Sequence, residues 1–325
     1  MKYIYIILGL VIIISSSSCD NHFKKDVSGI ESPNVQIQRY EMALFMSDLN
    51  QANIHQLQKK FPLFLGDVPL DSIQMNQLLN YVSDPYLQKL FWEADSVFPD
   101  MGKEEAQIDE AFKHVKYYFP AFEYPKVYTY ISGTQDQPYF QDGIVVLALD
   151  RYLGFGHEYY NMARIPKYQQ INMTSENLSR DVVFAIAQSY ISAPMPDANL
   201  LQQMIYQGKL MYFVKSMIPD VPDHVLFGLT KNNLGWLVQK EKDLWRYYIE
   251  NELLYKSDYL VQKKFISEAP FTADLGDDSS PKTGVWLGYQ IVFSYMKNNP
   301  IELSKMIHEM NAQELLMKSK YKPQK

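Results

Sequence analysis

The sequence contains a single cysteine, Cys19, among 325 residues. One cysteine excludes an intrachain disulfide framework and a structural zinc site built on cysteine ligands. Basic residues are also few: 31 Lys and Arg stand against 37 Asp and Glu, the net charge is −6, and no Lys/Arg run is longer than a pair. Nucleic acids attract basic surfaces, so we expect no nucleic-acid partner.

The motifs of the common hydrolases are absent as well. A zinc-peptidase helix carries His-Glu-x-x-His, which places two imidazoles on one face. No two of the six histidines are four residues apart, and Asn161 and Ala312 occupy the fifth position after His157-Glu158 and His308-Glu309. There is no Gly-x-Ser-x-Gly and no glycine-rich phosphate loop. We therefore predict no catalytic residue, no metal-ligand set and no cofactor.

The N-terminus carries the longest apolar run. Met1-Lys2 precedes twelve largely apolar residues, 3–14, and four serines then lead to Cys19. This order is typical of a secretory signal, and the run is too short for a membrane span of about 20 residues. A cysteine after small residues resembles a bacterial lipobox, although Ser16 stands where an apolar residue is usual. We predict a lipoprotein signal peptide at residues 1–18 and a lipid on Cys19; the alternative is an ordinary signal peptide with an incidental cysteine.

The remaining chain divides into a polar segment and a body. Residues 19–34 contain Ser28, Gly29, Ser32 and Pro33 and are predicted to form a flexible tether. Residues 35–325 show neither an internal repeat nor a linker, which favours a single domain.

Within the body, both helical and strand patterns occur. Alternating or β-branched runs predict strands at residues 35–39, 126–132 and 143–149, the last two separated by a polar loop at 133–142. Helical periodicity covers residues 47–60, 71–81, 85–96, 103–118, 181–192, 197–218, 232–254, 285–297, 300–309 and 312–319. The fold class is therefore α+β and predominantly α-helical, a small β-sheet followed by a helical half.

The helix expected after Pro281 is the most informative element of that half. Its apolar face includes Gly284 and Gly288, four residues apart. A glycine inside a helix costs about 1 kcal/mol relative to alanine, so this pair predicts close approach of a neighbouring backbone. We expect this helix to be the buried centre of the helical half. After it, Asn299, Pro300 and Glu302 fit the cap, first turn and capping box of a following helix.

Several pieces of the sequence, spread over most of residues 35–320, carry a family resemblance beside the lipobox-like N-terminus. They are Leu149 to Gly154, Tyr160, Pro166, Tyr168, Gln203 to Phe213, Leu244-Trp245, Leu253 to Tyr255, Ala269 to Phe271 and Pro281 to Met296. Together these pieces resemble the gliding-motility lipoprotein GldB family of Bacteroidota. The resemblance implies a membrane-anchored lipoprotein that faces the periplasm and has other motility or secretion-apparatus proteins as partners.

That family is in turn distantly similar to zincin-like metallopeptidases, which implies a degenerate zincin-like architecture. The helix from Asp181 would take the place of the metal helix. Gln188, Ser189 and Ser192 then stand where histidine, glutamate and histidine would be, and Gln207 takes the place of a later glutamate. None of these side chains forms a good zinc-binding set. The resemblance therefore implies a non-catalytic interaction or scaffold component with a degenerate cleft.

Two alternatives stay open at this point. One is a hydrolase or metallopeptidase with a divergent active site that uses Glu158 or Glu241. The other is a surface carbohydrate-binding lipoprotein, which rests on the 25 tyrosines and 17 phenylalanines. Such a protein would need exposed, coplanar aromatic rings around a groove.

Overall fold

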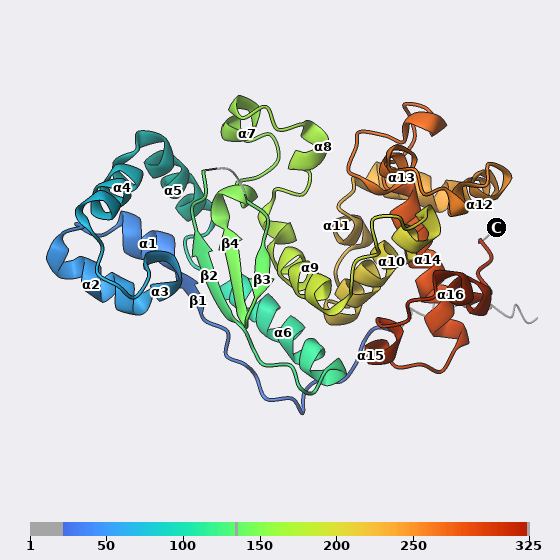
Figure 1. The fold of residues 1–325 in the computed structure, drawn as a ribbon, viewed down its shortest axis with the longest axis horizontal. Helices are drawn as coiled ribbons and strands as arrows, with labels where there is room; N and C mark the ends of the chain where they lie inside the picture. Colours follow the sequence, from blue (N-terminus) through green and yellow to red (C-terminus); the bar gives the residue numbers. More distant parts are fainter. Residues whose placement is uncertain (1–21, 134–135, 324–325) are drawn as a thin grey trace, which may run out of the picture.

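The computed structural model describes residues 22–133 and 136–323. It is 58% helical with one small mixed sheet, which confirms the predicted α+β, predominantly helical class. Figure 1 shows the N-terminal helices at one end of the long axis, the sheet in the middle and the C-terminal helices at the other end. The predicted signal peptide, residues 1–18, and Cys19 lie outside the described residues.

The sheet has four strands in the order β1-β2-β4-β3. The strands β1, β2 and β4 are parallel, and β3 runs antiparallel to β4. Asp142 and Gly143 join β3 to β4 with φ of 51° and 73°, as a two-residue hairpin turn requires. The predicted loop at 133–142 thus contains a strand that the sequence analysis missed. The strands are β1 (Ile37–Arg39), β2 (Lys126–Tyr130), β3 (Tyr139–Gln141) and β4 (Ile144–Ala148).

The two faces of β2 belong to different hydrophobic cores. Val127 joins the main core, which continues through the C-terminal helices, whereas Tyr128 joins a smaller core with the N-terminal helices. Successive side chains of a strand point to opposite faces, so burial on both sides produces the continuous apolar run seen in the sequence. The N-terminal helices are α1 (Tyr40–Phe45), α2 (Gln51–Lys60), α3 (Pro62–Leu65), α4 (Ser72–Ser83) and α5 (Pro85–Val97).

A long helix, α6 (Gly102–Tyr118), passes behind the sheet in Figure 1 and contacts α9 (Leu178–Tyr190) and α10 (Leu200–Met217). Its apolar stripe, with Ile108, Phe112 and Val115, is fully buried in the main core. Short elements connect the sheet to α9. They are η1 (Leu149–Tyr152), α7 (Glu158–Met162), α8 (Lys167–Gln170) and η2 (Ser175–Asn177).

The C-terminal helices surround α14 (Thr283–Asn298), which is buried along most of its length. This confirms that the helix after Pro281 is the centre of the helical half. No helix in the described part of the chain has the length and apolarity needed to cross a bilayer. The elements of the C-terminal half after α10 are α11 (Asp223–Phe227), α12 (Lys231–Glu250), η3 (Leu253–Tyr255), α13 (Tyr259–Ile266), η4 (Ala273–Leu275), α14 (Thr283–Asn298), α15 (Leu303–Met306) and α16 (Ala312–Ser319).

Glycines bring α10 and α14 into backbone contact, and this pair has the most extensive interface between helices. A Cβ added to Gly288 would overlap the carbonyl oxygen of Met204, and one added to Gly208 would overlap the carbonyl of Gly288. At Gly284 an added Cβ would lie 3.1 Å from the Phe265 carbonyl oxygen. The close approach expected from Gly284 and Gly288 is therefore confirmed, and Gly208 is its counterpart on α10.

The segment after α14 differs from the expected capping box. Asn299 has extended backbone, and its side chain donates to the carbonyls of Tyr295 (2.8 Å) and Lys318 (3.1 Å). It therefore caps the ends of α14 and α16 instead of starting a new helix. Pro300 precedes α15, and Glu302 at its N-cap makes no side-chain capping bond. The predicted helix 300–309 is reduced to one turn because tertiary contacts use the Asn299 side chain.

Residues 22–34, the described part of the predicted tether, lie against the rest of the protein, first along the helical half and then along α6. Phe23 and Val27 are only 7% and 5% exposed. The Phe23 ring lies between Tyr212 of α10 and Phe293 of α14, with centroids 5.0 and 5.9 Å away. The imidazole of His22 hydrogen-bonds the Tyr212 hydroxyl at 2.6 Å. This segment is therefore packed onto the domain, while residues 19–21 of the predicted tether lie outside the described residues.

Replacing Gly288 by alanine should destabilise the protein by about 3 kcal/mol or more, because the added methyl group meets a backbone carbonyl that cannot move alone. Gly235→Ala on α12 is the matched control, since its added Cβ meets nothing within 4 Å. That variant should gain up to about 1 kcal/mol from helix propensity. Urea unfolding of the purified variants measures both changes, and equal effects of the two substitutions would contradict the close-contact explanation.

Candidate functional site

A buried aspartate joins the ends of two parallel strands. Because β2 and β4 are parallel neighbours, Ser132 and Asp150 follow them at the same edge of the sheet. The Asp150 carboxylate accepts hydrogen bonds from the Ser132 amide (2.8 Å), the Ser132 hydroxyl (2.9 Å) and the Gly133 amide (2.9 Å). Asp150 is fully buried, and this burial raises the pKa of its carboxyl group against the opposing effect of those hydrogen bonds.

A second buried carboxylate connects this edge to the start of α9. Asp181 lies in the first turn of α9, where a negative charge is favoured by the helix dipole. It accepts a hydrogen bond from the Tyr152 hydroxyl at 3.0 Å and pairs with the Arg180 guanidinium. The Nε atom of Arg151 lies 3.9 Å from the same carboxylate. Burial next to Asp181 raises the pKa of Tyr152 well above its usual value, so the phenol stays a donor.

Lys282 adds a third basic group at the start of α14. Its ammonium group donates to the Phe227 carbonyl (3.1 Å) and the Glu268 carboxylate (3.3 Å), and Asn172 donates to the same Glu268 oxygen at 2.9 Å. Burial lowers the pKa of Lys282. The Glu268 carboxylate acts to raise this pKa, and the nearby Arg180 guanidinium acts to lower it further. The backbone of Lys282 is left-handed, with φ of +58°. Such a conformation costs of order 1 kcal/mol in a non-glycine residue and is common at functional sites.

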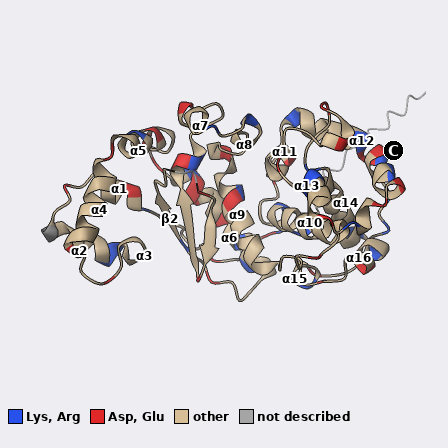
Figure 2. Cartoon of the chain, turned by 45° about the horizontal axis from the view of Figure 1, so that its top comes forward, with Lys and Arg blue, Asp and Glu red and all other residues tan. Residues whose placement is uncertain are grey.

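A cavity of about 450 Å³ opens beside these groups. Arg151 and Glu268 supply opposite charges to its wall, and Gln137 and Gln169 supply amides. Figure 2 shows acidic and basic residues close together at the end of the sheet near α9. We call this space the charged cavity; its lining residues are Gly133, Gln137, Arg151, Ala163, Ile165, Gln169, Met173 and Glu268.

Stretches that carry the family resemblance meet around the charged cavity. The Tyr160 hydroxyl donates to the Asp150 carbonyl (3.1 Å) and accepts from the Leu153 amide (2.7 Å), which fixes the turn after β4. On the other side, Tyr168, Ala269, Pro281 and Lys282 line a small adjoining pocket that shares Glu268 with the charged cavity. Pieces far apart in the sequence thus build one site.

The positions compared with zincin ligands lie elsewhere. Gln188 and Ser189 are exposed at the C-terminal end of α9, and Ser192 is exposed just beyond it. Gln207 is half-buried on α10. Seven residues, or about 10 Å of helix, separate Gln188 from Asp181, and none of the four predicted positions lines the charged cavity. Within residues 22–133 and 136–323, no group of three His, Cys, Asp or Glu side chains could hold a metal ion.

The two glutamates considered for a divergent hydrolase are in separate environments. Glu158, exposed on α7, pairs with Lys89 at 2.6 Å, and this hydrogen bond lowers the pKa of Glu158. Glu241 accepts from the Tyr321 hydroxyl at 2.8 Å and is 7% exposed. Glu241 is therefore covered by the C-terminal segment, whereas Glu158 lies on the surface.

Sequence reasoning missed the residues of the charged cavity. Arg151, Glu268 and Lys282 belong to or adjoin the stretches that carry the resemblance, but no short motif marks them as one site. One signal was available: Asp150-Arg151 directly follows a buried strand, and ligands of open sheets with parallel strands bind at the carboxyl ends of those strands.

Fold and site together define the class: a mixed α+β protein, mostly helical, with a polar cavity of both charges at the carboxyl edge of its sheet. The family described as gliding motility protein GldB matches residues 20–323, and the chain belongs to this family. It is therefore a gliding-motility-related lipoprotein. Searches of curated proteins and of solved structures gave no match.

Asp150→Asn should destabilise the protein by about 2–3 kcal/mol, because an amide group cannot accept from all three donors and leaves a buried N–H unpaired. Ser132→Ala, which removes only the hydroxyl donor, should cost about 1 kcal/mol. Chemical unfolding of both variants measures the difference. A smaller effect for Asp150→Asn than for Ser132→Ala would mean that this carboxylate does not join the two strand ends.

Proposed function

We propose that this chain is a non-catalytic interaction component of the gliding-motility apparatus, held in a membrane by a lipid on Cys19 and facing the periplasm. Family membership supports the link to motility. The lipobox-like position of the only cysteine supports the anchor. In this proposal the charged cavity binds a segment of another motility or secretion-apparatus protein without cleaving it.

The pairing of charges at the cavity is the observation that carries the binding role. Asp181 is engaged by Tyr152 and Arg180, and Glu268 by Lys282 and Asn172. Carboxylates fixed by such partners are oriented acceptors, and an acid engaged in this way is a poor general base. Arg151 and Glu268, together with the two glutamine amides, suit an extended segment that presents main-chain polar groups and charges of both signs.

Cys19→Ala should move the protein from the membrane fraction to the soluble fraction and abolish gliding in cells that depend on it. The reason is that the lipid would be attached to the Cys19 sulfur. Ser16→Leu is the control, because it makes the lipobox more regular and should leave the protein in membranes. Immunoblots of separated fractions give the result, and retention of Cys19→Ala in membranes would argue against the anchor.

Filling the charged cavity should stop gliding without removing the protein from membranes. Gln169 is half-buried in its wall, and Gln169→Trp would occupy part of the 450 Å³ while leaving every charge pair in place. Gln169→Ala keeps the space open and removes only one of the polar groups in the wall, so cells with this variant should keep most of their gliding. Colony spreading of complemented cells, with protein level and melting temperature as checks, measures the effect.

Normal gliding of a stable Gln169→Trp variant would contradict the binding role of the cavity. Peptide cleavage distinguishes the hydrolase alternative. Chelator-sensitive cleavage by the purified protein, abolished in Glu158→Gln or Glu241→Gln, would replace the binding role with a catalytic one.

A further inference from the structure

The packing of the N-terminal segment extends to His22, the first residue that the structure describes. His22 and Phe23 are bound to the helical half by the contacts described above, Lys24 pairs with Asp220 at 2.6 Å, and Val27 is buried. Buried aromatic contacts of this kind resist detachment far more than an exposed polar linker does. Contacts with the rest of the protein therefore extend at least as far as His22.

Only three residue steps then separate Cys19 from His22. A fully extended chain spans at most about 3.6 Å per residue, so His22 lies within roughly 10 Å of the Cys19 backbone. A free segment from 20 to 33 could instead have reached about 50 Å. The polar head-group layer of one leaflet is itself about 5–8 Å thick. A lipid on Cys19 would consequently place the surface around His22 against the bilayer.

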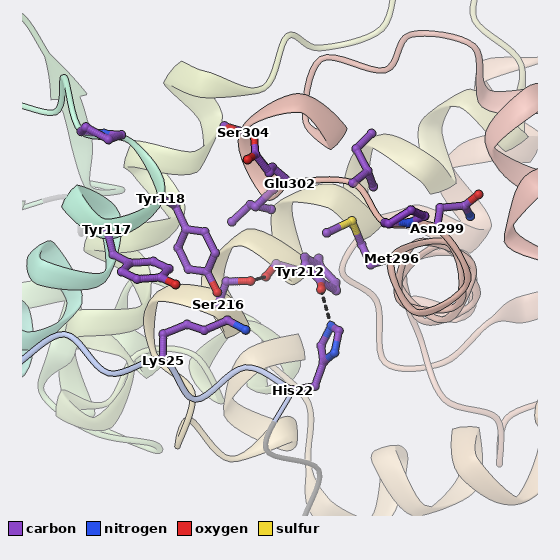
Figure 3. A pocket seen from close by; sticks show the side chains of 14 residues that line it. His22, Lys25, Tyr117, Tyr118, Tyr212, Ser216, Met296, Asn299, Glu302 and Ser304 are labelled. Atoms are coloured by element: carbon purple, nitrogen blue, oxygen red, sulfur yellow. Dashed lines mark hydrogen bonds between the residues drawn. The ribbon is translucent and has the colours of Figure 1, made fainter.

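That surface contains a groove of about 650 Å³. Figure 3 shows His22 and Lys25 on one side of it and Tyr117 and Tyr118, from the end of α6, on another. Asn299 and the residues up to Ser304 close the remaining wall. The Tyr117 side chain is 45% exposed. We call this space the anchor-side groove.

The composition of the anchor-side groove suits a lipid surface. Tyrosine rings concentrate at the head-group level of membranes, where an apolar ring and a polar hydroxyl are both satisfied. Lys25, the lysine in this lining, attracts anionic head groups, and Glu302 on another wall can accept from a head-group amine. A sugar-binding platform is less suited, because the rings of Tyr117 and Tyr118 are inclined at 85° and are not coplanar.

We propose that the anchor-side groove lies against the membrane that holds the lipid and accepts phospholipid head groups, with Lys25 and Tyr117 as contact residues. This inference rests on the proposed lipid anchor at Cys19. It goes further in assigning one face of the domain to the bilayer and in fixing the orientation of the rest of the molecule.

A depth measurement tests the orientation. Lipidation converts the Cys19 thiol to a thioether, so a cysteine introduced elsewhere is the only free thiol. Ser304→Cys places a fluorescent label in the groove wall, and Ser72→Cys places the same label on α4, at the opposite end of the molecule in Figures 1 and 2. The lipidated full-length proteins are reconstituted into phosphatidylethanolamine–phosphatidylglycerol vesicles that carry a head-group spin label.

We expect several-fold stronger quenching at residue 304 than at residue 72. A flexible Gly-Ser insertion of about 20 residues between Asn21 and His22, with a mean span of ~25 Å, should lower the quenching at 304 while the protein still floats with the vesicles. Flotation without quenching at 304, as for a groove that holds a protein segment, would overturn the inference alone. Quenching at residue 304 that the insertion leaves unchanged would also overturn the inferred orientation. Failure of the protein to float with the vesicles would overturn both this orientation and the proposed lipid anchor on Cys19.

Discussion

The backbone contact between α10 and α14 is the constraint on which the rest of the structure depends. Gly208 and Gly288 remove the side chains that would otherwise separate the two helices. Their contact places the start of α14, with Lys282, beside the charged cavity. It also aligns Tyr212 and Phe293, which together receive the ring of Phe23. One helix crossing thus positions both the candidate binding site and the N-terminal segment.

The charged cavity depends on a second constraint, the cost of burying ionised groups. An isolated buried charge is strongly unfavourable, whereas a charge with partners and hydrogen bonds is tolerated. Asp150 accepts from Ser132 and Gly133, whereas Asp181 and Glu268 each have donors from two segments. These contacts join the ends of β2 and β4, η1 to α9, and Glu268 to the start of α14. The site is therefore a product of tertiary structure, and neutralising one member affects several elements at once.

The sequence was informative where local physics decides the structure. Helical periodicity located the long helices, and two glycines four residues apart indicated close backbone contacts of α14, which Gly288 makes with α10 and Gly284 with α13. It was uninformative where tertiary contacts decide. The strand β3 has only three residues and forms against β4, and Asn299 caps helix ends that are distant in sequence. Likewise, Phe23 stands in a polar segment, and its burial follows from ring contacts with Tyr212 and Phe293 that lie far away in the sequence. The zincin comparison stays a prediction. The positions that it selected lie near the C-terminal end of α9 and on α10, and none of them lines the charged cavity.

The relation between the two proposed surfaces follows from the length of α14. Its 16 residues span about 24 Å. Lys282 adjoins the charged cavity at one end, whereas Met296 and Asn299 line the anchor-side groove at the other. A rigid, buried helix keeps these ends apart whatever the surface loops do. If the groove faces the lipid, the charged cavity opens more than 20 Å away along the helix, a separation that leaves it accessible to a protein partner in the periplasm.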